Sequence, residues 1–91
     1  MRTVEKTLYI KNKLGLHARA ATQLVQLSQS YQSEVLIICG DKKANANSVM
    51  ALLMLAGATG SEILVRCTGT DAESAMQAVQ QLIEAGFNEA D

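Results

Sequence analysis

The stretch EILVRCTGTDAESAMQAVQQLIEAGF, residues 62–87, predicts a β-strand that is followed directly by an α-helix. Its opening, EILVRCT, is short, apolar and β-branched, as is typical of a strand. Side chains alternate between the two faces of a strand, so Ile63, Val65 and Cys67 share one side. The pattern therefore predicts that this side packs on a core, while Leu64 lies on the uncovered side.

The helix expected after this strand begins near Thr70 and stops at Gly86, because glycine commonly ends a helix. Thr70 and Glu73 have the spacing of a capping box, in which two side chains satisfy free N–H groups of the first turn. Apolar residues recur along one stripe of this helix, as packing on a core requires. The stripe consists of Ala75, Ala78, Val79, Leu82 and Ile83.

Two earlier segments also predict strands. TVEKTLYI, residues 3–10, alternates loosely, and EVLIIC, residues 34–39, is short and apolar. A weaker strand is expected at residues 42–46, after a Gly-Asp turn. The core side of the second strand carries Val35, Ile37 and Cys39. The uncovered side of the sheet is expected to show Leu36, Ile38 and Leu64.

Two more helices are expected between the strands. ARAATQLVQLSQS, residues 18–30, places apolar residues at helical spacing. Its buried stripe is Ala21, Leu24 and either Leu27 or Ser28. SVMALLML, residues 48–55, begins at Ser48, a favourable N-cap residue, but its apolar residues run all round the helix.

The element order β-α-β-β-α-β-α favours an α+β fold with a four-stranded antiparallel sheet and three helices on one face. A chain of 91 residues, 48% hydrophobic and 19% charged, is expected to form one soluble domain over residues 1–91. Such a domain is too small for a deep cleft between two lobes, so its chemistry should lie near the surface.

Composition and charge argue against several functions. A net charge of −1 does not favour bulk nucleic-acid binding. The longest uncharged apolar stretch is too short to cross a bilayer, and no signal peptide is recognisable, so we expect a cytoplasmic protein. Cys39 and Cys67 lack metal-ligand spacing and are expected to be buried free thiols rather than a disulfide.

The segment NKLGLHARAA, residues 12–21, contains the one histidine of the chain, His17, and an arginine two positions later. With no second histidine and no nearby acid, neither a metal site nor a Ser-His-Asp arrangement can be built locally. A lone histidine at a helix start is commonly a surface residue or a cap. The alternative is a nucleophile, and the locally basic sequence favours an anionic group there, although a solvated basic edge would show the same charges.

If His17 is an N-cap, the N–H groups of the first helical turn can hold an anion on its ring. Those groups belong to Ala18, Arg19 and Ala20. The Arg19 guanidinium can also pair with phosphate oxygens through parallel hydrogen bonds. Gly15 lets the turn before the helix adopt backbone angles that are closed to other residues. The segment is therefore suited to holding a phosphoryl group.

GLHARAA, residues 15–21, followed later by NSVMALLMLA, residues 47–56, resembles the histidine phosphocarrier family HPr. The resemblance spans the whole chain in length and element order. The second segment and the tail GFNEAD, residues 86–91, look more like the nitrogen-related branch, NPr, than the sugar-transport branch. One departure is Ala20, which stands where the family usually has proline.

The resemblance implies an open-faced β-sandwich that relays a phosphoryl group without cofactor or metal, as a cytoplasmic monomer rather than a turnover enzyme. It implies that His17 accepts the group from a phosphoenolpyruvate-dependent Enzyme I-type donor and passes it to a IIA-type acceptor, with Arg19 assisting. Ser48 falls on a serine that a kinase modifies in some members, but its role as an N-cap is the simpler explanation.

The family resemblance also gives the apolar second helix a role, because this helix lies beside the histidine and docks on partner proteins. If Leu52 and Leu55 face the core, four residues are left for docking: Val49, Met50, Leu53 and Met54. A merely over-apolar helix remains an alternative. Two further alternatives are a sugar-transport HPr and a regulatory module whose second helix controls a target protein.

Overall fold

The computed structural model describes residues 2–55 and 60–88 and contains one four-stranded antiparallel sheet in the order β1-β4-β2-β3. The strands are β1 (Arg2–Tyr9), β2 (Glu34–Cys39), β3 (Lys42–Asn45) and β4 (Glu62–Gly69). The helices are α1 (Ala18–Gln29), α2 (Val49–Leu53), α3 (Ala72–Glu84) and a 3-10 turn, η1 (Gly86–Asn88). Residue 56 of the apolar segment and residues 89–91 of the tail lie outside the described residues.

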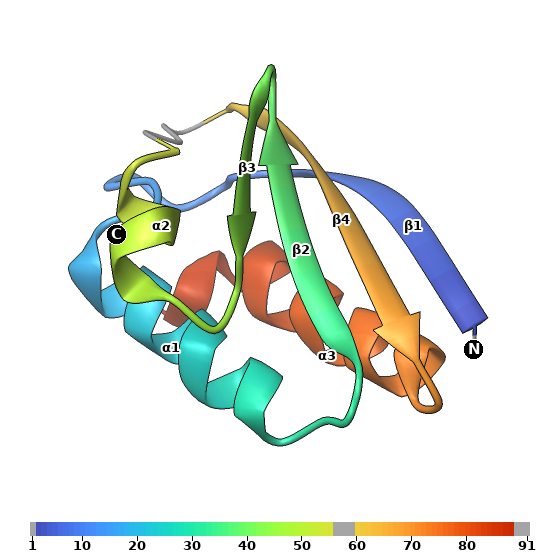
Figure 1. Cartoon of the computed structure of the whole chain (residues 1–91). Helices are drawn as coiled ribbons and strands as arrows, with labels where there is room; N and C mark the ends of the chain where they lie inside the picture. The colour runs from blue at the N-terminus through green and yellow to red at the C-terminus, as the bar shows by residue number, and fades with distance from the viewer. Residues whose placement is uncertain (1, 56–59, 89–91) are drawn as a thin grey trace.

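The helices cover one face of the sheet and leave the other open, as Figure 1 shows. Helices α1 and α3 cross beneath the strands, and α2 lies beside α1. This arrangement confirms the predicted α+β open-faced sandwich. All four predicted strands and all three predicted helices are present.

The core lies between the sheet and the helices, on the side that strand alternation predicts. Val35 and Ile37 of β2 are buried there with Ile63, Val65 and Cys67 of β4. On the open face Leu36, Ile38 and Leu64 are half-buried, as expected.

The two cysteines are free thiols, but only one of them is buried. Cys39 is half-buried, so the prediction of a core position is wrong for it. It is the last residue of β2 and pairs with Lys42 at the hairpin, where the layer of helices no longer covers the sheet. Burial, together with the nearby Asp71 carboxylate, raises the pKa of the Cys67 thiol to about 11. Cys67 is therefore a protonated, inert packing residue at neutral pH.

Helix α3 begins one residue later than predicted, and the capping box is absent. Asp71, not Thr70, is the N-cap, and its side chain makes no capping bond to the helix. Glu73 instead forms a 2.9 Å ion pair with Arg2. The stripe also needs correction, since Met76 is buried while Ala78 and Leu82 are half-buried. In α1, Ser28 rather than Leu27 is buried.

The Asp71 carboxylate is used to hold the loop between α1 and β2. It accepts hydrogen bonds from the backbone N–H groups of Gln32 and Ser33, each at 2.9 Å, and from the Ser33 hydroxyl. The backbone at Gly69 lies very close to this loop. A Cβ added at Gly69 would be only 2.7 Å from the Ser33 Cα. The Ser33 hydroxyl and then the Gln32 N–H are the main causes that lower the pKa of Asp71 below its ordinary value.

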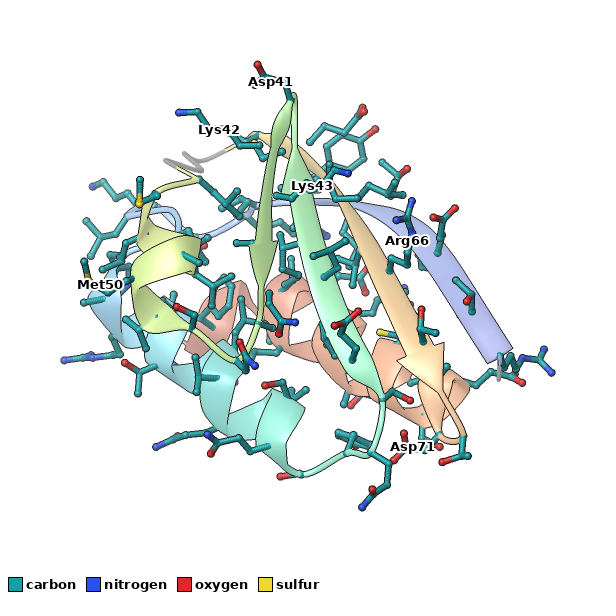
Figure 2. The ribbon with its side chains drawn as sticks, in the orientation of Figure 1. Asp41, Lys42, Lys43, Met50, Arg66 and Asp71 are labelled. Atoms are coloured by element: carbon teal, nitrogen blue, oxygen red, sulfur yellow. The ribbon has the colours of Figure 1, made fainter. Side chains whose placement is uncertain are left out.

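We expect acid to remove stability through Asp71. The pKa of Asp71 is lower in the folded than in the unfolded chain. The carboxylate therefore contributes fully to the free energy of unfolding above the unfolded pKa, and this contribution is lost as the pH falls through the folded pKa. Urea unfolding of wild type and Asp71→Asn, from neutral pH to about pH 2, should show a difference in midpoint that closes in acid. Asp41→Asn, at the hairpin tip in Figure 2, should follow wild type throughout. A difference that persists unchanged in acid would contradict this role.

Candidate functional site

The turn between β1 and α1 is held by a short network of hydrogen bonds. The Asn12 side-chain amide donates to the Gly15 carbonyl at 2.6 Å, and the Gly15 N–H donates to the Asn12 carbonyl at 3.1 Å. The His17 N–H also donates to the Gly15 carbonyl, at 3.0 Å. Gly15 has a φ of 67°, which a residue with a Cβ adopts only under strain. The turn therefore presents His17 in one defined orientation.

His17 is the N-cap of α1, as the sequence predicts. Its backbone is extended, with φ −89° and ψ −179°, and its Nδ1 accepts the Arg19 backbone N–H at 3.3 Å. The first intrahelical bond runs from the Ala21 N–H to the His17 carbonyl at 2.9 Å. Because Nδ1 is the acceptor, the neutral ring carries its proton on Nε2. Nδ1 is thus an unprotonated nitrogen at the positive end of a helix.

The remaining residues of the first turn differ in exposure. Ala18 and Arg19 are exposed, so the guanidinium of Arg19 is free to meet a group from solvent. Ala20 is fully buried, yet its N–H lies before the first intrahelical bond, like those of its two predecessors. Of these three residues, Arg19 donates its backbone N–H to the ring of His17.

Helix α2 has the exposed apolar surface that the sequence predicts, with one correction. Leu52 and Leu55 are buried, whereas Met50 is 71% exposed, Met54 72% and Leu53 37%. Met50 stands at the outer edge of the molecule in Figure 2. Val49 is half-buried and packs partly against the core, so it is less exposed than predicted. As the first residue of a short helix, it lies next to the chain that enters the helix from the sheet.

Leu14, in the turn before His17, is a further exposed apolar residue, at 71%. Sequence periodicity could not find it, because it lies outside every helix and strand. Figure 1 shows this turn beside α2. We call Leu14, Met50, Leu53 and Met54 the apolar surface.

Ser48 has a clear structural role. It is the N-cap of α2, and its hydroxyl accepts the Ala51 N–H at 3.2 Å.

The basic residues of the N-terminal segment do not form one cluster. Arg2 pairs with Glu73, and the Lys6 ammonium donates to the Gln80 side chain at 2.9 Å, both of them across to α3. Lys11, Lys13 and Arg19 are exposed and flank His17 in the sequence. Within residues 2–55 and 60–88, no three His, Cys, Asp or Glu side chains gather where they could hold a metal ion. No helix in the same ranges is long and apolar enough to cross a membrane.

Comparison with known proteins shows the family to which the chain belongs. The family model described as "PTS HPr component phosphorylation site" matches residues 4–85. Phosphocarrier protein NPr of Shewanella violacea is 46% identical over 90 residues, which cover 99% of both chains. NPr of Escherichia coli K12 is 48% identical over 88 residues, covering 96% of this chain and 98% of the relative. The crystal structure of HPr-C-His from Thermoanaerobacter tengcongensis has a TM-score of 0.91 at 38% identity, over 97% of this chain and 99% of that one.

These relatives, which share the open-faced sandwich, are small phosphocarriers. The chain belongs to the HPr family of the phosphotransferase system. Its likeness to proteins named NPr supports the nitrogen-related branch. The family works with Enzyme I and IIA-type proteins.

We expect Ser48→Ala to lower the free energy of unfolding by about 1 kcal/mol, because the Ala51 N–H loses its cap. Chemical denaturation measures this loss. Ser74→Ala, at an exposed position inside α3, is the matched control and should not destabilise, since alanine favours helix. Equal stability of Ser48→Ala and wild type would show that the cap contributes nothing.

Proposed function

We propose that residues 1–91 form a single domain that carries a phosphoryl group on Nδ1 of His17 in the cytoplasm. An Enzyme I-type protein of the nitrogen-related branch would donate the group, and a IIA-type protein would accept it. The observation that carries this proposal is the N-cap geometry, in which Nδ1 accepts the Arg19 N–H at 3.3 Å. An unprotonated ring nitrogen there has a lone pair ready for attack and N–H groups ready to receive an anion.

In the transfer step, the Nδ1 lone pair attacks the phosphorus of the donor's phosphoryl group. A nitrogen–phosphorus bond forms, the bond to the donor breaks, and its electron pair leaves with the donor. The proton on Nε2 stays in place. The Arg19 N–H then donates to a phosphoryl oxygen instead of to Nδ1. The Ala18 and Ala20 N–H groups belong to the same turn and would bind further oxygens.

The charge of the phosphoryl group is offset by few groups, which suits a carrier. The Arg19 guanidinium is exposed and can approach the oxygens, and the helix dipole favours the anion. Interactions that held phosphohistidine more tightly than the transition state would raise the barrier to passing the group on. A shallow site with one arginine and a few N–H groups therefore fits reversible transfer.

We propose that the apolar surface docks donor and acceptor in turn. Three of its residues lie on α2 or at its end and Leu14 lies in the turn before His17, and exposed apolar side chains of this kind mark interaction sites. Its two methionines are flexible and suit partners of different shape. For Ser48 we propose the structural role of a cap and no regulatory one, since its hydroxyl is already bonded to Ala51.

We expect His17→Ala to take up no phosphoryl group from labelled phosphoenolpyruvate and Enzyme I, because the chain has no second imidazole. Arg19→Ala should fold with an unchanged melting temperature and transfer roughly ten- to a hundred-fold more slowly, as loss of one charge-assisted hydrogen bond implies.

Enzyme I proteins of both branches are compared by initial rates of labelling. Label on His17→Ala would overturn the proposed site, and faster labelling by the sugar-branch enzyme would overturn the branch.

Met50→Glu should weaken binding to Enzyme I, with little loss of stability, because the side chain is exposed in the free protein and would be desolvated in a complex. Isothermal titration measures the affinity, and thermal unfolding measures the stability. Gln77→Glu, an exposed position on α3, adds the same charge away from the apolar surface and should bind like wild type. Equal loss of affinity in both variants would point to charge alone rather than docking.

A further inference from the structure

Among residues 2–55 and 60–88, Asn12 is the largest buried polar side chain, and it lies in the turn that leads to His17. It is only 1% exposed. Burial of an amide costs free energy unless its polar groups are hydrogen-bonded, so such a residue needs a specific role. Its Nδ2 donates to the Gly15 carbonyl at 2.6 Å, a short bond between two groups removed from solvent.

The Gly15 carbonyl links Asn12 to His17. It accepts two donors, the Asn12 side chain and the His17 backbone N–H, the latter at 3.0 Å. The Gly15 N–H returns a bond to the Asn12 carbonyl, which closes the turn. Leu16, which lies between Gly15 and His17 in the sequence, is buried and anchors this turn to the core. The orientation of one peptide group thus fixes where the backbone of His17 begins.

The C-terminal turn supports Asn12 from the other side. A Cβ at Gly86 would lie 3.5 Å from the Asn12 Cβ, so the backbone of η1 packs directly on this side chain. Phe87, the next residue, is buried, and its carbonyl accepts the Gln23 side-chain amide of α1 at 3.1 Å. Asn12 is therefore held between the His17 turn and η1, with little freedom to choose another partner.

We infer that Asn12 is a positioning residue for phosphoryl transfer at His17, an inference that rests on the proposed function. Its amide fixes the Gly15 carbonyl, the carbonyl fixes the His17 N–H, and the resulting extended backbone aims Nδ1 at the Arg19 N–H. Without the amide donor, the Gly15 peptide can rotate and Nδ1 is no longer held at the helix start. Transfer depends steeply on such alignment, because reacting atoms must meet in one geometry.

The test compares Asn12→Ala with Asn12→Ser, which differ by one hydroxyl that can donate toward the Gly15 carbonyl. Labelling by Enzyme I should be roughly ten- to a hundred-fold slower in Asn12→Ala at saturating donor, with KM unchanged because the apolar surface is intact. Asn12→Ser should recover part of the rate. Val79→Ala, a core change in α3, controls for lost stability alone and should label like wild type.

Nitrogen NMR of the His17 ring gives a readout that does not need Enzyme I. In wild type, the neutral ring should carry its proton on Nε2, and Asn12→Ala should show a mixture of the two tautomers. Wild-type rates and wild-type tautomers in Asn12→Ala would overturn the positioning role, as would an equal loss of rate in Val79→Ala. If wild type itself took no label, the proposed function would fail, while the tautomer shift would still decide whether Asn12 positions the ring.

Discussion

The free N–H groups at the start of α1 are the constraint on which this site depends. A helix cannot satisfy its own first N–H groups, and here the chain offers a histidine ring nitrogen rather than the usual hydroxyl or carboxylate oxygen as the cap. That choice has two consequences. It selects one tautomer of the ring, and it places an exchangeable acceptor where a phosphoryl oxygen can replace it. In the proposed transfer, the N–H group that caps the ring in the resting protein is also the one that would bind a phosphoryl oxygen.

The sheet and the C-terminal turn make this exchange possible by fixing the approach to the helix. β1 leads into the turn, and β4 pairs with it along its whole length, from Arg2 opposite Gly69 to Tyr9 opposite Glu62. The Ile10 N–H then donates to the Ser61 carbonyl at 3.0 Å, so pairing continues to the edge of the turn. Helix α3 and η1 lie on the other side of this turn, where Phe87 of η1 is buried. The turn is exposed at Leu14 and half-buried at His17, and it is anchored at both ends.

Much of this architecture follows from patterns that a single sequence carries. Strand alternation located the core through Ile37 and Val65, and the position of His17 before a helical pattern predicted its N-cap. Tertiary contacts decided the rest. Asp71 rather than Thr70 is the N-cap of α3, and its carboxylate binds Ser33, a contact between segments far apart in the chain. Asn12 left no signal, since its role depends on a carbonyl three residues away and on η1 at the other end of the chain.

Ala20 shows how the same constraint bears on the difference from the usual family pattern. Proline in the first turn removes no intrahelical bond, so a helix tolerates it there, but it also removes an N–H. The first intrahelical bond of α1 is donated by the Ala21 N–H, so the Ala20 N–H has no place in the intrahelical ladder. With alanine the site keeps three consecutive N–H donors, and with proline it would keep two. The departure thus adds one N–H donor to the first turn of α1, upstream of the first intrahelical bond at Ala21.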